Sequence, residues 1–459
     1  MESKKLSLGT KLGFGIGDIG GNMLFQIMGF HLMFYLTDTV GLSSALAGTA
    51  LMIGKIWDAV TDPAMGYISD RTKSRMGRRR PYLLAGAVLA FIAMVVMFFN
   101  PHIGKENEML LFVWAIGAFC LLCLAFTIFN VPYSALTPEL TSDYQEITSV
   151  NGFRMFFALI GTLIGAGVFP IFVSIFTPEG SKDSSQGYLA AGIITGLIIA
   201  SVTLITFFSI KEKKREVEKV KTEENIFVAY LKTFKNKSFV FVLFAWVFNM
   251  VGITIISAIM NYYFTWILGD TELTKIALFI LIATAMGSMA IWVKIIKRLE
   301  KKIAYAIGLG ILGVVCLIVF FFAEFFGVWF MFVMVGIAGI GLAVTYVSPW
   351  SMVADTIEED HVRTGKKKEG TFYGLWTLIS KIGQAIAFQI MGIILFVSGY
   401  IEPEKGQIVV QPESALTAIK FLLGPVPFIV LITGIVIVLN YPLNAAKYDE
   451  IRKQADAMK

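Results

Sequence analysis

The chain has 459 residues, of which 56% are apolar and only 16% are charged, and its mean hydropathy is +0.73. A soluble domain holds about a quarter charged residues, whereas here nine uncharged stretches of 20 to 32 residues separate clusters of charge. These features exclude intrinsic disorder, a secreted disulfide scaffold and a nucleic-acid binder. They indicate a polytopic helical membrane protein.

Twelve membrane spans are predicted in chain order, each long enough to cross a bilayer as a helix. The first half carries six, at approximately 12–36, 45–68, 82–100, 109–131, 151–176 and 187–210. The second half carries six more, at approximately 239–268, 276–296, 303–323, 328–352, 371–399 and 415–440. The first stretch is too long for a cleavable signal peptide and contains Asp18, so we expect it to remain as a helix.

Lysine and arginine are distributed unequally between the two sides of these spans. One side, which includes both tails and the middle segment, carries 31 of the 39 Lys and Arg, whereas the other carries four. Because positive charge is retained in the cytoplasm, we expect both termini and the middle segment to be cytoplasmic.

A short internal repeat supports a division into two halves. Val131–Leu136 (VPYSAL) ends the fourth span, and Ser348–Val353 (SPWSMV) ends the tenth. We therefore expect an N-terminal six-helix bundle at 1–210, a cytoplasmic linker at 211–237, a C-terminal six-helix bundle at 238–440 and a cytoplasmic tail at 441–459. Two parallel six-helix repeats with a binding site between them are typical of major facilitator transporters.

Six charged side chains fall inside predicted spans, namely Asp18, Lys55, Asp58, Asp62, Arg154 and Lys381. If all six faced lipid, the cost would be ~15 to 21 kcal/mol, which exceeds the ~5 to 15 kcal/mol that stabilises a typical fold. They must therefore face a polar cavity or one another. Their formal charges sum to zero, which suits an internal network.

The second span carries Lys55, Asp58 and Asp62 at offsets that place them on one helix face. Two carboxylates four residues apart repel each other unless a cation lies between them or one takes a proton. We therefore predict a Na⁺ or H⁺ site at Asp58 and Asp62. The alternative is structural: the trio could form salt bridges that hold the halves together.

Uncharged polar side chains lie on the same helix faces as several of these charges. Asn22 and Gln26 follow Asp18, and Thr377 and Gln384 flank Lys381. The fourth span carries Thr127, Asn130 and Ser134 on one face, and aromatic residues occur nearby at Tyr133, Tyr346, Trp350 and Trp376. Sugars need several hydrogen bonds together with flat apolar faces. For any single Thr or Ser, a hydrogen bond to its own helix is the alternative. Arg154 could instead snorkel to the interface, whereas we expect Lys381 to pair with Asp58 or Asp62.

The chain resembles the glycoside-pentoside-hexuronide:cation symporter family, the group of melibiose permease. The resemblance rests on Asp18, on Ile56–Tyr67 (IWDAVTDPAMGY) with the following Ser69–Pro81 (SDRTKSRMGRRRP), and on Asn130–Tyr133 (NVPY). Met352–Asp355, Glu369–Phe372 and Lys381 extend it into the second half, so it covers essentially the whole chain.

This resemblance implies cation-coupled uptake of a sugar or glycoside by alternating access. Its implied cation-binding residues are Asp58, Asp62 and Thr127, with Lys381 linking the cation and sugar sites, and its implied sugar-binding residues are Asp18, Arg154 and Tyr346. The polar helix faces described above add Asn22, Thr127, Asn130 and Thr377 to the predicted substrate-binding residues, which also include Lys381. Gly66, Asp70, Arg71, Arg78 and Arg79 resemble a cytoplasmic gating motif. The chain departs from the melibiose type at Gly17, Lys55, Asn130 and Ser134, which argues against an α-galactoside substrate.

Two other functions remain open. A lysolipid transporter of the same fold would bind acyl chains rather than sugars, and a non-transporting sugar sensor would bind ligand without flux. No nucleophile with an adjacent base indicates an enzyme, and no cofactor beyond the coupling ion is expected. The expected partners are a small sugar or glycoside and membrane lipid, without nucleic acid, for a monomer in a bacterial inner membrane.

Overall fold

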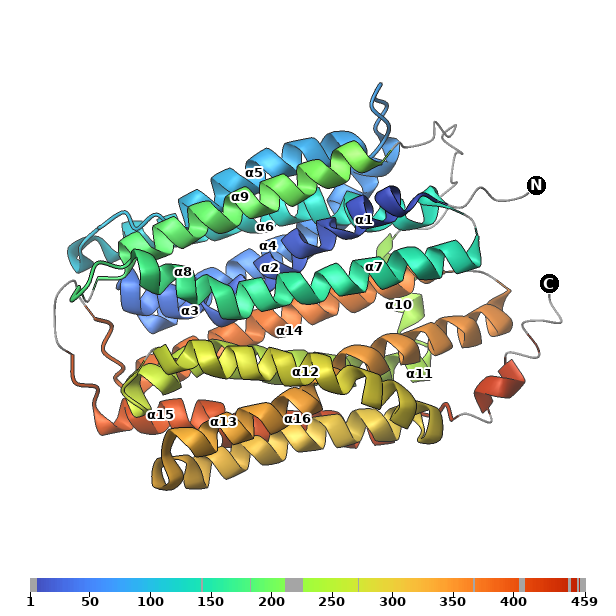
Figure 1. Cartoon of the computed structure of the whole chain (residues 1–459). Coiled ribbons are helices and arrows are strands. Elements are labelled where there is room, and N and C mark those ends of the chain that lie inside the picture. Colours follow the sequence, from blue (N-terminus) through green and yellow to red (C-terminus); the bar gives the residue numbers. More distant parts are fainter. Residues whose placement is uncertain are drawn as a thin grey trace. The chain divides into compact units, whose positions relative to one another are not determined.

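The computed structural model describes residues 6–141, 143–181, 183–210, 226–270, 272–365, 368–403, 409–444, 447–451 and 454. Every regular element in these ranges is a helix (Figure 1). Residues 211–225 of the predicted linker and most of the tail beyond 451 lie outside the described residues. Packing groups the chain into two compact units, Met1–Lys219 with Phe388–Ala415, and Val220–Ala387 with Leu416–Lys459. The predicted bundle boundaries stay predictions.

The helices of the first unit are α1 (Leu8–Gly15), α2 (Gly17–Phe30), α3 (Leu32–Phe34), η1 (Tyr35–Thr39), α4 (Ser44–Arg71), α5 (Arg80–Phe98), η2 (Lys105–Asn107), α6 (Glu108–Leu140), α7 (Tyr144–Leu163), η3 (Ile164–Val168), α8 (Phe169–Phe176) and α9 (Ser185–Ser209). Helix α5 packs on α6 and α9, α4 packs on α6, and α2 packs on α7 (Figure 1). The residues singled out on α2, α4, α6 and α7 therefore belong to neighbouring helices.

The helices of the second unit are α10 (Ile226–Thr233), α11 (Lys237–Tyr262), η4 (Tyr263–Ile267), α12 (Glu272–Arg298), α13 (Lys301–Thr364), α15 (Glu413–Leu423) and α16 (Pro425–Leu439). Helix α14 (Glu369–Val397) is divided at Phe388, and the first residues of α15 belong to the first unit, because that unit includes Phe388–Ala415. Helix α13 packs on α12 and α16, and α11 packs on α16.

Nine described helical segments are long and apolar enough to cross a membrane, and a tenth is added when Leu8–Phe30 and Leu32–Thr39, bent by 50°, count as one span. Helix α13 supplies two spans, because Gly327 breaks it with φ 73° and ψ −159°, a backbone conformation that glycine alone adopts readily. Helix α4 has 28 residues and is long enough to cross a membrane, but its charged side chains lower its mean hydropathy, so it is not among these segments. Counted this way, the described helices supply the twelve predicted spans.

The same backbone turn ends the first helix region of each half. The turns are Tyr35–Gly41 and Tyr263–Gly269, and each begins with a π-helix. In both, the residue before the glycine donates its N–H to the carbonyl five residues back, and the residue after it donates six residues back, over 2.9–3.2 Å. Gly41 and Gly269 have φ of 83° and 73°, so each closes its turn in the left-handed region.

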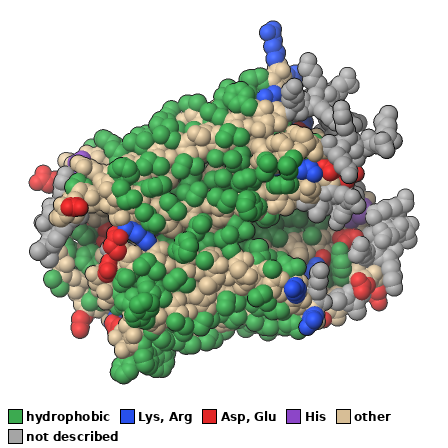
Figure 2. Space-filling model, in the orientation of Figure 1, with side chains coloured by type: hydrophobic (Ala, Val, Ile, Leu, Met, Phe, Trp, Pro, Cys, Tyr) green, Lys and Arg blue, Asp and Glu red, His purple; other side chains and the backbone are tan. Residues whose placement is uncertain are grey.

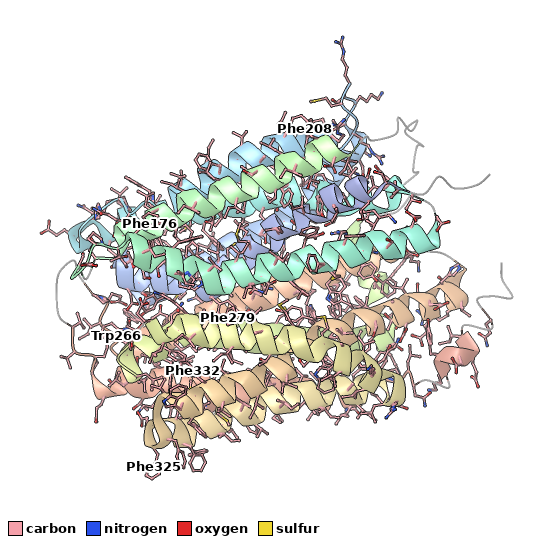
Figure 3. All side chains as sticks on the ribbon, viewed as in Figure 1. Phe176, Phe208, Trp266, Phe279, Phe325 and Phe332 are labelled. Atoms are coloured by element: carbon pink, nitrogen blue, oxygen red, sulfur yellow. The ribbon has the colours of Figure 1, made fainter. Side chains whose placement is uncertain are left out.

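Apolar side chains cover the middle of the helices, and charged side chains gather toward their ends (Figure 2). Large aromatic side chains project outward, among them Phe208, Phe279 and Phe325, which are 73%, 56% and 83% exposed (Figure 3). A soluble monomer does not expose apolar surface on this scale. The surface is that of a protein solvated by lipid.

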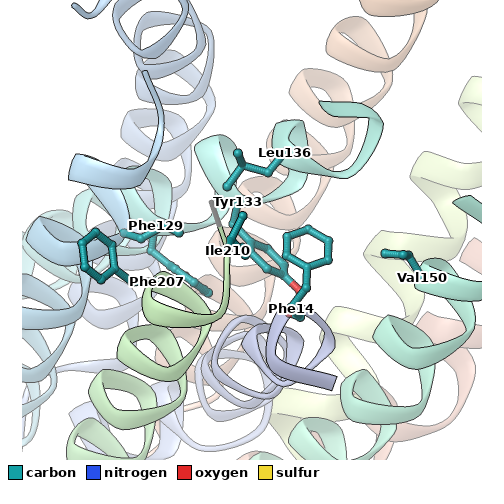
Figure 4. Packing of buried hydrophobic residues seen from close by; sticks show 8 residues of the cluster. Phe14, Phe129, Tyr133, Leu136, Val150, Phe207 and Ile210 are labelled. Carbon is teal, nitrogen blue, oxygen red and sulfur yellow. The ribbon is translucent and has the colours of Figure 1, made fainter. Parts of the chain in front are cut away.

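Buried apolar side chains of the first unit form a cluster where α1, α5, α6, α7 and α9 meet, composed of Phe14, Leu83, Phe129, Tyr133, Leu136, Val150, Phe207 and Ile210 (Figure 4). Tyr133 stacks on Phe129 with ring centroids 5.6 Å apart. The hydroxyl of Tyr133 lies at the polar edge of this cluster, 2.8 Å from the carbonyl oxygen of Phe14. The cluster therefore positions a polar group beside α2.

Candidate functional site

Two carboxylates of α4 meet one hydroxyl of α6. Thr127 Oγ1 lies 3.1 Å from Asp58 Oδ1 and 2.8 Å from Asp62 Oδ1. Asp58 and Thr127 are buried, with exposed fractions of 1% and 0%. Because a hydroxyl carries a single hydrogen, Thr127 donates to only one of these carboxylates at a time. The structure thus brings together three of the four predicted cation-binding residues.

A second hydroxyl, which the sequence reasoning missed, adjoins this group. Thr61 Oγ1 lies 3.4 Å from Thr127 Oγ1 and also donates to the carbonyl oxygen of Asp58 over 3.3 Å. Thr61 immediately precedes Asp62 in the motif, and this adjacency was the available signal. Hard cations, Na⁺ among them, prefer oxygen ligands. Such oxygens are supplied here by the side chains of Asp58, Asp62, Thr61 and Thr127.

Lys55 does not join its neighbours on α4 in an ion pair. Within the described residues its Nζ forms no salt bridge with Asp58 or Asp62, and it lies 5.8 Å from the ring centroid of Phe25. The side chain is nevertheless buried, with 3% exposed. The alternative in which the trio forms salt bridges that hold the halves together stays a prediction.

Asp18 of α2 and Arg154 of α7 form a buried, bidentate ion pair. Arg154 donates from Nε to Asp18 Oδ2 over 2.7 Å and from Nη2 to Asp18 Oδ1 over 3.1 Å. Tyr133 donates to Asp18 Oδ2 over 2.6 Å, and Thr137 Oγ1 accepts from Arg154 Nη1 over 2.7 Å. Arg154 also lies over the Tyr133 ring, 4.9 Å from its centroid. Arg154 thus turns toward Asp18 instead of snorkelling to the interface.

The remaining predicted substrate residues fall into two groups. In the first unit, Asn22 donates to the backbone carbonyl of Asp18 over 2.9 Å, and Asn130 faces Gly21, with Oδ1 3.4 Å from where a Cβ on Gly21 would lie. In the second unit, Thr377 donates to the carbonyl of its own helix over 3.0 Å. Thr377 thus makes the bond to its own helix that is the alternative for a Thr or Ser. Asn22 makes a bond of the same kind.

Tyr346 and Lys381 also belong to the second unit. Tyr346 is 36% exposed on α13, and Lys381 is buried on α14, with 9% exposed. Asp58 and Asp62 belong to the first unit. The predicted pairing of Lys381 with either carboxylate stays a prediction.

Aromatic rings of α11, α13 and α14 gather beside the polar face of α14. Trp246 stacks on Trp376 with centroids 5.2 Å apart, and Trp350 stacks on Tyr373 at 6.0 Å. Trp246 Nε1 donates to Ser380 Oγ over 2.7 Å. Trp350 and Trp376, two of the aromatic residues noted in the sequence, also lie next to each other, with ring centroids 5.9 Å apart.

Three of the five predicted gating residues form a charged network at the ends of α4, α5 and α6. Arg79 donates to Asp70 Oδ1 over 2.7 Å and lies 3.2 Å from Glu139 Oε1. Arg78 also bonds to Glu139, which the sequence reasoning did not single out. Arg71 lies instead over the Tyr67 ring, 3.6 Å from its centroid. A Cβ on Gly66 would lie 3.9 Å from Val131 Cγ1, at an ordinary van der Waals distance.

A further ion pair joins α1 to the start of α7, ahead of its membrane span. Glu146 Oε2 accepts from Lys11 Nζ over 3.0 Å and from the backbone N–H of Leu6 over 3.1 Å. The hydrogen bond from Lys11, followed by that from Leu6, lowers the pKa of Glu146. This contact lies on the side of the membrane that the basic segments assign to the cytoplasm.

No group of three or more His, Cys, Asp or Glu side chains that could hold a metal ion occurs among the described residues. The described residues Cys120, Cys123 and Cys316 are not joined in a disulfide. What the site offers chemically is a pair of carboxylates with two hydroxyl oxygens.

Comparison with known proteins identifies the family. Residues 13–445 match the family described as MFS/sugar transport protein. The chain belongs to this family. This transporter is therefore a multi-pass membrane protein of the major facilitator superfamily and not an enzyme, and the predicted fold class is confirmed.

Several relatives cover nearly the whole transporter. The uncharacterized symporter sll1374 of Synechocystis sp. is 30% identical, with 100% of this chain and 98% of that protein covered. The glucuronide carrier protein homolog of Escherichia coli is 26% identical, with 100% and 97% covered. The sodium-dependent lysophosphatidylcholine symporter 1 of Mus musculus is 24% identical, with 100% and 90% covered.

Solved structures of similar fold share little sequence with this transporter. The nucleoside transporter NupG superposes with a TM-score of 0.67 at 11% identity, over 93% of this chain and 99% of that one. At this identity the likeness establishes the fold alone.

Proposed function

We propose that the protein is a cation-coupled symporter that imports a sugar or glycoside by alternating access, with Na⁺ or H⁺ as the coupling ion. The observation that carries this proposal is the position of the Thr127 hydroxyl between Asp58 and Asp62. Two carboxylates four residues apart on one helix repel each other while both are ionised. A cation bound between them, or a proton on one of them, removes the repulsion that remains.

The proposed sugar or glycoside substrate is supported by the family description and by the glucuronide carrier relative. The proposed substrate-binding residues are Asp18, Asn22, Thr127, Asn130, Arg154, Tyr346, Thr377 and Lys381. We assign Lys381 to both the cation and the sugar, and Gly66, Asp70, Arg71, Arg78 and Arg79 to a cytoplasmic gate. The protein is further proposed to act as a monomer in a bacterial inner membrane, with both termini in the cytoplasm.

A lysolipid substrate is the second candidate, and the mouse lysophosphatidylcholine symporter supports it at a similar identity. The two substrate classes differ in what they demand of the protein, because an acyl chain needs a long apolar slot and a sugar needs several hydrogen-bonding groups. Uptake into proteoliposomes separates them. Accumulation of labelled glycosides, and not of lysophosphatidylcholine, is the expected result.

The coupling proposal is tested with Asp62→Asn in the same proteoliposomes. The amide keeps the shape of the side chain but loses its charge, so cation binding should fail while substrate exchange down its own gradient continues. Concentrative uptake driven by a Na⁺ or H⁺ gradient is therefore expected to disappear. Normal accumulation by Asp62→Asn would remove Asp62 from the proposed site.

Thr127 supplies a matched pair of variants for the same assay. Thr127→Ser keeps the hydroxyl between the two carboxylates, and Thr127→Val replaces it with a methyl group of similar volume. We expect Thr127→Ser to retain cation-driven uptake and Thr127→Val to need a higher cation concentration. Equal cation dependence of the two variants would contradict a ligand role for the hydroxyl.

A further inference from the structure

The turn that joins the two arms of α13 differs from the connection between α11 and α12 in the same unit. Within Lys301–Thr364, which is described throughout, only Gly327 has non-helical φ and ψ, so a single residue separates the arms. The stretch 320–332 around this turn contains one charged residue, Glu324. The connection between α11 and α12 instead carries Asp270, Glu272 and Lys275. The turn of α13 therefore lacks the polar loop that carries a connection into water.

Aromatic side chains surround this turn and project away from the protein. The five most exposed of them form what we call the aromatic tip, and their exposed fractions are 67% for Phe321, 48% for Phe322, 83% for Phe325, 57% for Phe326 and 81% for Trp329. Phe325 points outward from the turn (Figure 3), and apolar side chains cover the same end of the molecule (Figure 2). The rings of the tip contact one another, with the centroids of Phe325 and Phe326 4.9 Å apart.

The aromatic tip continues the lipid-facing surface of both arms. Trp329 shares one helix face of the second arm with Val333 and Ile337, which are 58% and 38% exposed. On the first arm, Phe321 lies two turns from Val314, which is 49% exposed. No polar band separates the tip from these faces. The lipid that covers the arms is therefore expected to cover the tip as well.

The single charge beside the tip is held in an ion pair within the same unit. Glu324 Oε1 lies 2.5 Å from Lys420 Nζ of α15. Next to this pair, Phe320 contacts Phe421 edge to face, with centroids 5.0 Å apart. A charge with a partner is tolerated near the acyl chains better than an isolated one. The pair thus removes the main obstacle to placing this turn in a membrane.

The length of the first arm places the turn at the level of the lipid headgroups. Lys301 begins this arm at the basic, cytoplasmic end, and roughly 26 residues at ~1.5 Å each carry the helix ~39 Å to Gly327. A bilayer is ~30 Å thick across its hydrocarbon and ~40 to 45 Å with the headgroups included. A turn at this distance reaches the outer headgroups without passing beyond them. Aromatic rings are enriched in this layer.

We propose that the aromatic tip is a membrane anchor, which inserts at the boundary between headgroups and acyl chains of the outer leaflet and keeps the turn at Gly327 inside the bilayer. Its partner is the phospholipid bilayer itself. Burial of these rings in lipid fixes the depth at which both arms of α13 lie in the membrane. The inference goes beyond the proposed transport function, because it involves neither the cation nor the substrate residues.

Spin labelling of the full chain in phosphatidylcholine vesicles tests the anchor. The native Cys120, Cys123 and Cys316 are first replaced by alanine, and a nitroxide is attached at Phe325→Cys or, as the matched control, at Val410→Cys. The two positions are equally exposed, at 83% and 82%, so the proposal distinguishes them only by the solvent around them. Power saturation compares the collisions of each nitroxide with oxygen, which concentrates among acyl chains, and with NiEDDA, which stays in water.

We expect the ratio of oxygen to NiEDDA collisions to exceed one at Phe325→Cys and at Trp329→Cys, and to fall below one at Val410→Cys. Glu272→Cys, in the charged connection of the same unit, should resemble Val410→Cys. With the label at Trp329→Cys, adding Phe325→Asp should lower the ratio, because a carboxylate is disfavoured among acyl chains. Adding Phe325→Tyr should leave the ratio unchanged, because tyrosine suits the same layer.

A ratio at Phe325→Cys as low as that at Val410→Cys would place the tip in water and overturn the proposal. Few collisions with either reagent, together with spectral broadening by a second nitroxide, would place another copy of this chain on the tip and overturn it too. An unchanged ratio in the Phe325→Asp variant would contradict the anchoring role of Phe325. None of these measurements requires a transported solute, so failure of the proposed function and failure of the anchor are distinguishable.

Discussion

Replacing Arg154 by methionine tests the interpretation of the Asp18–Arg154 pair as a buried ion pair. The guanidinium makes two bonds to the Asp18 carboxylate, and the two side chains are only 15% and 10% exposed. Methionine fills a similar volume without charge. Asp18 would then keep the Tyr133 hydroxyl as its hydrogen-bond donor, while its charge would lose its counter-ion.

The magnitude follows from burial. Removing one partner of a buried pair costs about 3 to 5 kcal/mol, because the other charge is left uncompensated. The pair Glu272–Lys275 provides the contrast, because its carboxylate is 64% exposed although Lys275 is only 12% exposed. A pair whose carboxylate is in contact with solvent contributes at most about 1 kcal/mol. Arg154→Met should therefore destabilise the transporter at least three times as much as Lys275→Met.

Thermal unfolding in detergent measures both variants, together with Asp18→Asn and the double variant. Because the two side chains share one interaction, the double variant should lose less stability than the sum of the two single variants, by about 0.5 to 3 kcal/mol. Strict additivity would refute the ion pair as the source of the effect. A loss for Arg154→Met no larger than that for Lys275→Met would refute the argument from burial.

Two further predictions concern stability. The pKa of Glu146 is lowered, so its contacts with Lys11 and Leu6 contribute fully to stability above the unfolded-state pKa of about 4.3 and are lost as the pH falls through the folded-state pKa. The difference in melting temperature between the parent and Glu146→Gln should therefore shrink from pH 7 to pH 3. A constant difference would contradict this. Gly327→Ala should destabilise the folded protein by about 1 to 3 kcal/mol, because alanine tolerates the φ of 73° poorly. The control Gly117→Ala, in the middle of a helix, should be neutral or stabilising. Equal shifts in melting temperature for the two variants would show that the Gly327 backbone is not strained.

Most of the twelve-helix pattern could be predicted because nine uncharged stretches are each long enough to span a bilayer. Composition alone fails at α4, since the charges that make it functional also lower its hydropathy. It fails again at α13, where the break depends on the backbone of Gly327, and the adjoining sequence is as apolar as the spans.

The residues of the candidate site could be predicted in part, but the contacts between them could not. The spacing of Asp58 and Asp62 places both on one face of α4, and Thr127 was singled out through the family resemblance, but only packing of α4 on α6 brings the hydroxyl between them. Asp18 and Arg154 were each identified as charges in spans, yet 136 positions separate them and no local pattern pairs them.

The matching turns at Tyr35–Gly41 and Tyr263–Gly269 bear on the history of the chain. Each combines an initial tyrosine, a threonine two positions later and a left-handed glycine four positions after that, around the same unusual hydrogen bonds. Independent origin would have to produce three residue choices and one rare helix type twice, at equivalent ends of the two halves. A single ancestral six-helix gene that already possessed this turn, and was later duplicated and fused, accounts for both copies.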